Sequence, residues 1–357
     1  MDEIFARRRN RLRELMLEKG FDAVLISYAA NRFYLSGFEL HDVQFNETSG
    51  YLAVGADGRD ILLTDPRYLE AAAKCLPREN IVIYKGAQHE AMSKTLKGLG
   101  RRIGLEMDAL SMNCVRTLAA SCPELSFESC DGMTEGLRQM KDSREIAALE
   151  KSFVLNHNML TWLEGELVPG LSEKEVSWKI ERYFRENGAS ELAFESIVAI
   201  DENAAMPHAL ASDKTITENC LVLVDVGCRV DGYCSDQTRT FWVGGQKDSR
   251  FEETLALVRE AQSAAIACMH PGVAFADVYT QARNVFEKAG CAEAFTHGLG
   301  HGVGLETHEK PSLSPRSQGK LQAGMVVTVE PGLYYPQWGG CRWENTVLVV
   351  EDGVRIL

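Results

Sequence analysis

Five potential metal ligands are concentrated in the C-terminal part of this 357-residue chain, between residues 225 and 344. Four are carboxylates and one is a histidine, and they stand at Asp225, Asp236, His301, Glu330 and Glu344. Carboxylates that are held close together repel one another unless a cation neutralises them. Divalent metal ions bind both carboxylate oxygen and imidazole nitrogen. The chemistry that this set indicates is hydrolysis at a site for two metal ions.

The first two carboxylates lie on a predicted β-hairpin. Residues 220–244 form two β-rich runs joined by Asp231-Gly232, a strong turn signal. Asp225 ends the first run and Asp236 lies in the second, so we expect them roughly opposite each other. Like charges on adjacent strands are destabilising, and a cation between them would reverse that effect. Taken alone, the pair is explained equally well without a metal ion, by one aspartate at a strand end and the other in a solvated turn.

Three of the eight histidines lie close together, at His297, His301 and His308. The glycines between them argue against a helix and for backbone packed closely against another group. The HExxH motif of zinc peptidases is excluded, because no second histidine follows His308-Glu309 at the required spacing, and no dinucleotide-binding fingerprint fits. Three histidines on one glycine-rich segment indicate a functional site.

The last two carboxylates flank a loop rich in proline and glycine. Glu330 closes the apolar run MVVTV, and Glu344 precedes the run TVLVV. A glutamate at the end of a buried strand needs a partner. Arg342 is one candidate partner, and a metal ion shared with His301 is the other.

The elements that position these residues suggest two domains, 1–133 and 134–357. Strands alternate with helices in the first, which indicates a small α/β domain. The second begins with helical patterns, of which one has a capping box of Ser172 and Glu175. The expected helices are 2–19, 88–97, 110–120, 142–166, 172–187, 249–268 and 275–289, and the expected strands include 21–27, 80–86, 101–107 and a hairpin at 49–68.

Composition excludes several classes of function. A net charge of −13 disfavours nucleic acid as a partner. The arginines at positions 7, 8, 9, 11 and 13 are interpreted as a solvated helix face rather than a nucleic-acid or membrane patch. The ten cysteines form no CxxC pair, the N-terminus is charged, and no apolar run has the length of a membrane span. We expect a cytoplasmic protein with free thiols and no membrane attachment.

The motifs resemble those of metallopeptidase family M24, the pita-bread enzymes that include methionine aminopeptidases, aminopeptidase P, prolidase and creatinase. Segments 225–240, 297–311 and 330–345 are similar nearly position by position. Segments 33–38 and 49–65 resemble the N-terminal domain of the proline-specific branch and of creatinase, while 137–152, 193–199 and 206–209 resemble the catalytic domain. The implied fold is α/β (α+β), a creatinase-like N-terminal domain followed by a pita-bread domain.

The resemblance implies an Xaa-Pro aminopeptidase or dipeptidase that acts through a hydroxide bridging two divalent ions. Manganese is expected first, with cobalt, zinc or iron possible. Asp225 would chelate one ion, His301 and Glu330 would bind the other, and Asp236 and Glu344 would bridge them. The substrate would be a peptide with proline in second position, and the enzyme would be a homodimer.

Four catalytic roles follow from the same resemblance. Glu330 would transfer the proton from water to the leaving nitrogen. His208 and His308 would contact the substrate carbonyl and stabilise the oxyanion. His297 would line the pocket for the residue after the cleaved bond. Outside the metal ligands, Arg342 would orient Glu344, and Thr238, which is close to Asp236 in the chain, is a candidate to support the ligands.

Two alternatives remain at this stage, a creatinase-like hydrolase of a small non-peptide C–N bond and a catalytically silent binding module. Retention of all five ligands counts against both. Related dipeptidases often have an arginine shortly after the HExP stretch, where this chain has Ser312, which favours longer peptides. Tyr233, Tyr334 and Trp343 are candidate apolar surfaces for the proline ring.

Overall fold

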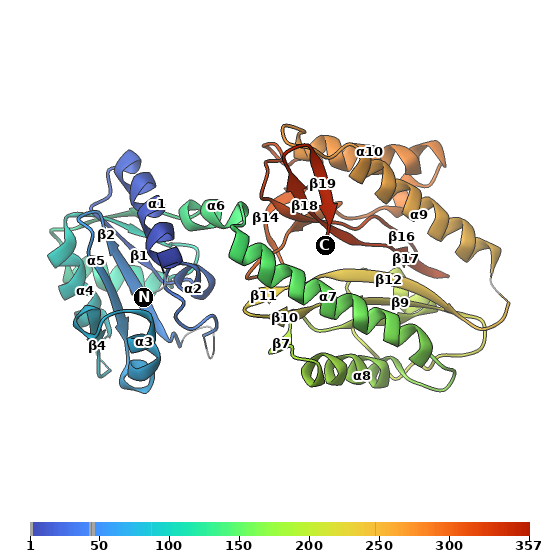
Figure 1. Ribbon diagram of the computed structural model, residues 1–357, viewed down its shortest axis with the longest axis horizontal. Helices are drawn as coiled ribbons and strands as arrows, with labels where there is room; N and C mark the ends of the chain where they lie inside the picture. Colours follow the sequence, from blue (N-terminus) through green and yellow to red (C-terminus); the bar gives the residue numbers. More distant parts are fainter. Residues whose placement is uncertain (1–2, 43, 45–46, 87, 247) are drawn as a thin grey trace. The chain divides into compact units, whose positions relative to one another are not determined.

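The computed structural model describes residues 3–42, 44, 47–86, 88–246 and 248–357. The chain forms two compact units, Met1–Arg138 and Gln139–Leu357 (Figure 1). The two units divide after Arg138, whereas the sequence predicts a domain boundary near residue 133. Arg138 belongs with the first unit because its Nη1 donates a hydrogen bond to Asn31 Oδ1 at 2.8 Å.

The N-terminal unit is an α/β domain built on one six-stranded sheet, in the order β4-β3-β2-β1-β5-β6. β2 and β3 form the hairpin that the sequence predicts, while β5 and β6 run parallel to β1. Its helices are α1 (Glu3–Lys19), α2 (Ala29–Ser36), α3 (Leu69–Cys75), α4 (Gln88–Leu99), α5 (Met112–Ser121) and α6 (Met133–Gln139). Its strands are β1 (Ala23–Ile26), β2 (Gly50–Gly55), β3 (Asp60–Thr64), β4 (Ile81–Ile83), β5 (Arg102–Leu105) and β6 (Ser126–Ser129).

The arginine-rich start of α1 is not a fully solvated face, so that interpretation is wrong for two of its residues. Arg8 and Arg9 are only 5% and 4% exposed. Arg8 lies over the ring of Tyr34, and Arg9 donates to Leu35 O and pairs with Asp60. These long side chains bury their aliphatic stems and dock α1 onto α2 and β3, a role that spacing along one helix does not reveal.

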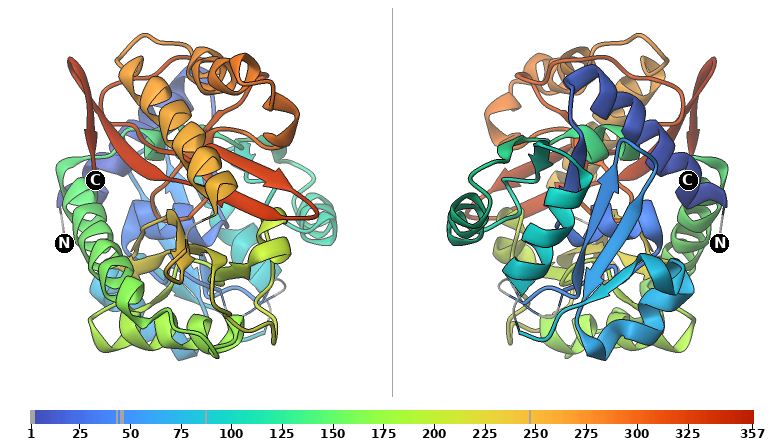
Figure 2. Two further views of the ribbon diagram at one scale, coloured as in Figure 1. Left: turned by 90° about the vertical axis from the view of Figure 1, so that its right-hand side faces the viewer. Right: turned by 90° about the vertical axis from the view of Figure 1, so that its left-hand side faces the viewer.

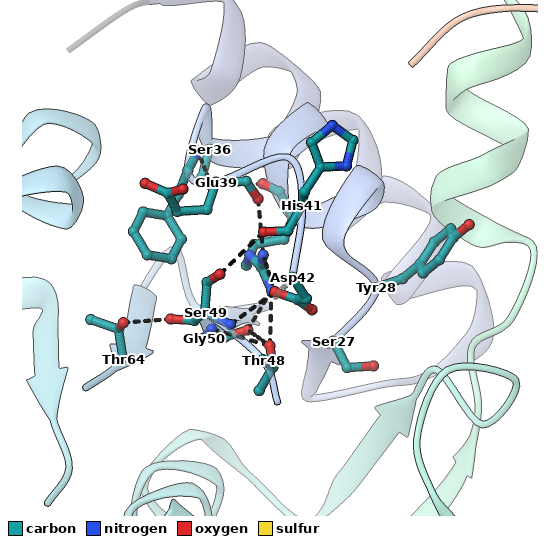
Figure 3. A network of polar contacts seen from close by, with 12 residues as sticks. Ser27, Tyr28, Ser36, Glu39, His41, Asp42, Thr48, Ser49, Gly50 and Thr64 are labelled. Carbon is teal, nitrogen blue, oxygen red and sulfur yellow. Dashed lines mark hydrogen bonds and ion pairs between the residues drawn. The ribbon is translucent and has the colours of Figure 1, made fainter. Parts of the chain in front are cut away.

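A fully buried arginine, Arg32, organises the polar contacts of the segment between α2 and β2. Figure 3 shows this network around Asp42, Ser49 and Gly50. Arg32 donates hydrogen bonds to Gly50 O at 2.7 Å and Glu39 O at 2.9 Å, and it pairs with Asp42 at 2.9 Å. Burial would raise the pKa of Asp42, but the charge of Arg32 together with hydrogen bonds from Arg32 and Ser49 lowers that pKa. Because the guanidinium has several fixed donors, it joins both ends of this segment.

The C-terminal unit places four long helices around several short antiparallel sheets. Its helices are α7 (Ser143–Glu166), α8 (Glu173–Glu186), α9 (Ser249–Ala267) and α10 (Phe275–Lys288), with a short 3₁₀ helix η3 (Asp201–Ala205). Its first strands are β7 (Glu191–Leu192), β8 (Ile197–Ile200), β9 (Cys220–Val226), β10 (Cys228–Val230), β11 (Tyr233–Cys234) and β12 (Gln237–Val243). The later ones are β13 (Gly300–Gly302), β14 (Glu309–Leu313), β15 (Val326–Val329), β16 (Gly332–Tyr335), β17 (Gly339–Arg342), β18 (Asn345–Val350) and β19 (Gly353–Ile356).

The sheet β12-β9-β8 separates two hydrophobic cores. Val222 and Val224 point to the core shared with α7 and α8, whereas Leu221 and Leu223 point to the core shared with α9 and α10. Figures 1 and 2 show these helix pairs (green and orange) on either side of the strands. Since side chains alternate along a strand, Asp225 points to the same side as Leu221 and Leu223.

Two further expectations concern cysteines and membranes. All ten cysteines are free thiols, seven of them classed as buried. In the described part of the chain, no helix is long and apolar enough to cross a membrane.

Candidate metal centre and active site

Strand register brings the first two carboxylates to one face. In the β9–β12 pair, Thr238 stands opposite Asp225, and Gln237 stands opposite Val226. Asp236 directly precedes β12 and is therefore not the cross-strand partner of Asp225, in contrast to the simple hairpin prediction. Directly paired residues share a face, and so do residues two apart. Asp236 therefore lies on the face of Asp225, shifted along it by two residues.

The two glutamates arrive from neighbouring strand ends. Glu330 follows β15, and its backbone N–H donates to Leu299 O. Glu344 lies between β17 and β18, and its N–H donates to Thr238 O. The Thr238 hydroxyl donates to Glu344 Oε2 at 2.9 Å. Thr238, the candidate supporting residue from the sequence, thus contacts the ligand candidate Glu344.

His301 presents one ring nitrogen to two carboxylates. Its Nε2 lies 3.5 Å from Asp236 Oδ2 and 3.3 Å from Glu330 Oε1. Its Nδ1 lies 3.1 Å from the carbonyl oxygen of Gly302, which can only accept a hydrogen bond. The Nδ1 proton is therefore fixed on the backbone side, and Nε2 is the atom free to bind a metal ion.

The carboxylates are crowded and short of cations. Ligand atoms of Asp225, Asp236 and Glu344 all lie within 4.8 Å of one another. Burial and the charges of Glu344 and Asp225 raise the pKa of Asp236, and burial with the charges of Glu330 and Asp225 raises that of Glu344. Burial alone would also raise the pKa of Glu330, but the hydrogen bond and charge of His301, with the charges of His297 and Arg342, lower that pKa to about 2.

The donor set fits divalent metal ions. Asp225 Oδ1 and Glu344 Oε1 are buried, and neither has a hydrogen-bond partner in the described chain. Buried charged oxygens that lack a donor are costly unless a cation meets them. Four carboxylates and one imidazole are ligands that Mn²⁺, Co²⁺, Fe²⁺ and Zn²⁺ accept. The two oxygens without a hydrogen-bond partner therefore fit the positions of metal ligands.

Arg342 connects the carboxylates to the rest of the cavity. Its Nη2 donates to Asp225 Oδ2 at 2.8 Å, and its Nε donates to the Thr238 hydroxyl at 2.9 Å. It therefore bonds Asp225 directly and reaches Glu344 through Thr238, whereas the sequence predicted direct orientation of Glu344. Its Nη1 donates to the Tyr334 hydroxyl at 2.8 Å.

Tyr334 continues this chain to a histidine. The Tyr334 hydroxyl lies 2.9 Å from His297 Nε2, and His297 Nδ1 lies 2.6 Å from Gly298 O. Because the carbonyl requires the proton on Nδ1, Nε2 of the neutral ring accepts from Tyr334. Burial lowers the pKa of His297 and raises that of Tyr334 to about 12, so both groups stay neutral. Tyr334 is thereby committed to positioning His297 and is not an open surface for proline.

A cavity of about 460 Å³ opens beside the carboxylates. It contains all three histidines that the sequence nominated besides the ligand His301, namely His208, His297 and His308. The ring of His308 lies 4.2 Å from that of His301, centroid to centroid. Burial lowers the pKa of His308, which favours its neutral form. The structure thus brings the nominated histidines to one cavity together with Asp225, Asp236 and Glu330.

The cavity wall bears on the remaining candidates. Ser312 lines it, and Arg342 is the single Lys or Arg among the described lining residues. Tyr233 and Trp343 do not line it, since Tyr233 donates to Glu145 and Trp343 stacks against Arg239. Phe194 and Leu210 provide the apolar surface instead.

Sequence reasoning missed several groups that shape this site. One is the pair of Lys141 and Glu309, whose side chains are 1% and 6% exposed and 3.2 Å apart. Glu309 Oε1 also accepts from Glu306 N, which closes the turn before His308. The position of Glu309 next to a candidate catalytic histidine was a usable signal, but its partner lies 168 residues away in the chain.

Comparison with known proteins agrees with this geometry. The profile of metallopeptidase family M24 matches residues 147–351, and that of the creatinase/prolidase N-terminal domain matches residues 8–140. An Xaa-Pro dipeptidase of Pyrococcus horikoshii is 33% identical over 96% of this chain and 94% of its own. A solved Xaa-Pro dipeptidase from Bacillus anthracis superposes with a TM-score of 0.92 at 32% identity, covering 99% of this chain and 97% of that one. A solved X-Pro aminopeptidase from Thermotoga maritima gives 0.85 at 30% identity, covering 94% and 95%. The chain belongs to metallopeptidase family M24, with a creatinase/prolidase N-terminal domain followed by the pita-bread catalytic domain.

Proposed function

We propose that this protein hydrolyses the peptide bond between an N-terminal residue and a proline in second position. One observation carries the proposal: three carboxylates with two orphaned oxygens lie beside His301 and Glu330 at the wall of a cavity. Relatives that align with nearly the whole chain are named Xaa-Pro dipeptidases.

Asp225, Asp236, His301, Glu330 and Glu344 would hold two divalent metal ions, for which manganese is the expected choice. When bound, such ions lower the pKa of water and polarise a carbonyl group. Arg342 and Thr238 would keep Asp225 and Glu344 oriented through the hydrogen bonds described above. A carboxylate whose oxygens are held by fixed donors keeps the geometry that the ions require.

The cavity histidines would handle the substrate. His208 and His308 would donate hydrogen bonds to the scissile carbonyl as its oxygen becomes an anion, which is where fixed donors contribute most. Glu330 would accept a proton from the attacking water and return it to the leaving nitrogen. His297, held by Tyr334, would present its ring as one wall of the proline pocket. A tertiary amide lacks an N–H, so recognition of proline must rely on shape.

The cavity supports longer peptides over dipeptides. A dipeptide brings its free carboxylate into the cavity, where a basic side chain would stabilise it. Arg342 is already bonded to Asp225, and Ser312 occupies the wall. We therefore propose an aminopeptidase that cleaves Xaa-Pro-Yaa tripeptides more efficiently than Xaa-Pro dipeptides, although relatives are named dipeptidases.

No observation on the described residues favours the two alternatives from the sequence, a creatinase-like hydrolase and a catalytically silent binding module. A creatinase-like hydrolase does not use the metals, and a silent binding module has no need of the full ligand set. All five ligand side chains converge at one place here. A homodimer is also proposed, on the family resemblance, and a reducing cytoplasmic location is proposed on the ten free thiols.

The test is release of the first residue from Xaa-Pro dipeptides and Xaa-Pro-Yaa tripeptides, by metal-free protein and after addition of Mn²⁺, Co²⁺, Zn²⁺ or Fe²⁺. Metal-dependent cleavage of the tripeptides is expected, with little release from matched Xaa-Ala-Yaa controls. Absence of cleavage with every metal would refute the proposed function. Efficient cleavage of dipeptides alone would refute the preference for longer peptides.

A further inference from the structure

One buried carboxylate holds both ends of the segment that carries His208. Segment 200–212 includes η3 and the MPHA stretch, and it leads from β8 toward β9. Glu173 Oε1 accepts the backbone N–H of Ile200 at 2.7 Å, and its Oε2 accepts the N–H of Ser212 at 2.8 Å and the Ser212 hydroxyl at 2.5 Å. Asn203, inside the segment, donates to both oxygens.

Glu173 is 0% exposed, and within the described chain its charge is met by N–H and O–H donors without an ion pair. A buried carboxylate is costly unless such donors surround it. The start of α8 adds a favourable dipole, because Glu173 is its first residue. The arrangement is therefore stable only when both ends of segment 200–212 are in place.

Capping of α8 does not explain Glu173. The helix already has a complete capping box, in which Ser172 Oγ accepts from Glu175 N and the Glu175 side chain accepts from Ser172 N. Glu173 makes none of these contacts, and its donors all come from segment 200–212. Its side chain thus acts on the tertiary structure.

The position of His208 depends on this backbone. The His208 side chain is exposed at the cavity and has no hydrogen bond, ion pair or ring contact within the described chain. Its neighbour Pro207 accepts from Arg342 Nη1 at 3.3 Å. Gly340 allows β17 to pack closely on the carbonyl of Ala204. The imidazole is therefore located by how the segment is anchored rather than by contacts of its own.

We propose that Glu173 is a positioning residue of the reaction, which acts by holding segment 200–212 so that His208 reaches the substrate carbonyl. The expected effect on the reaction rate rests on the proposed function. The anchoring of segment 200–212 rests on the hydrogen bonds alone. Displacement of a substrate-contacting group by about 1 Å can cost on the order of 100-fold in rate.

The kinetic test is a double-mutant cycle on an Xaa-Pro-Yaa tripeptide, with metal present. Glu173→Gln keeps the side-chain size but places an N–H₂ where an acceptor is needed. We expect kcat to fall roughly 10-fold with a smaller change in KM. In the His208→Ala background the same substitution should change kcat by less than about twofold, because coupled residues are not additive. Glu175→Gln, two residues further along α8 and exposed, is the matched control and should leave kcat unchanged.

The structural test does not need activity. Amide hydrogen exchange of peptides covering 200–212 should become faster in Glu173→Gln and remain unchanged in Glu175→Gln. If Glu173→Gln does not fold, Glu173→Asp, which keeps the charge and loses reach, takes its place in both tests.

The outcomes separate the two proposals. An inactive parent enzyme refutes the proposed function, and the exchange experiment then still decides whether Glu173 anchors the segment. An active parent in which Glu173→Gln lowers kcat equally with and without His208 overturns the positioning role. Unchanged exchange over 200–212 overturns the anchor itself.

Discussion

Replacement of Asp236 by asparagine should change stability in opposite directions with and without metal. The ligand atoms of Asp225, Asp236 and Glu344 lie within 4.8 Å of one another, and among the residues that the structure describes no lysine or arginine bonds to Asp236. Two unit charges at that distance repel by about 3.5 kcal/mol at an effective dielectric constant of about 20. Protonation relieves part of this repulsion, because burial and the charge of Glu344 raise the pKa of Asp236.

We therefore expect metal-free Asp236→Asn to be more stable than the parent by about 1–3 kcal/mol. For a domain of this size, that difference raises Tm by roughly 3–10 °C. Saturation with Mn²⁺ at about 100 times Kd should stabilise the parent by about 2.7 kcal/mol. The variant should gain much less, because an amide cannot bridge two ions as a carboxylate does, and its activity should be mostly lost.

The assay is thermal unfolding of both proteins in chelator and in excess Mn²⁺, with metal content measured after dialysis. Asp352→Asn, in the exposed turn between β18 and β19, is the control and should change neither condition. A metal-free variant less stable than the parent would contradict the crowding argument. A variant with the full Mn²⁺ shift and full activity would contradict the bridging role.

Three further outcomes are expected. Arg32→Met should destabilise the N-terminal domain by about 3–5 kcal/mol in urea unfolding, because it removes the charge partner of Asp42 and one hydrogen-bond donor from each of the Gly50 and Glu39 carbonyls; a loss below about 1 kcal/mol would count against the network. Burial raises the pKa of Glu106 from 4.5 to about 7. The protonated Glu106 therefore contributes to folding stability, and this contribution is complete below about pH 4.5 and is lost as pH rises through about 7. Glu106→Gln should flatten that dependence of stability on pH, and a variant with the same pH profile as the parent would contradict this reasoning. Ser312→Arg should raise dipeptide relative to tripeptide cleavage about 10-fold by pairing with the free carboxylate, as measured by the ratio of kcat/KM values; an unchanged ratio would show that position 312 does not face the carboxylate.

Much of the fold was predictable, because local rules decide it. The helix Glu173–Glu186 begins where Ser172 and Glu175 form a capping box, as predicted, since the contacts span only three residues. The β2–β3 hairpin followed from two β-rich runs around a short turn. The burial of Arg8 and Arg9 was not predictable in this way, because their partners Tyr34, Leu35 and Asp60 lie on other elements.

The sequence by itself determined which side chains could bind metal and in what order they occur, because residue type and short spacing carry that information. The tertiary structure decided their pairing: strand register placed Thr238, not Asp236, opposite Asp225. It also decided that Tyr334 serves His297 rather than a proline ring. Register and packing depend on contacts between segments distant in the chain, whose energies a local pattern does not contain. Glu173 shows this most plainly, since only the folded chain brings its carboxylate to both ends of the segment that carries His208.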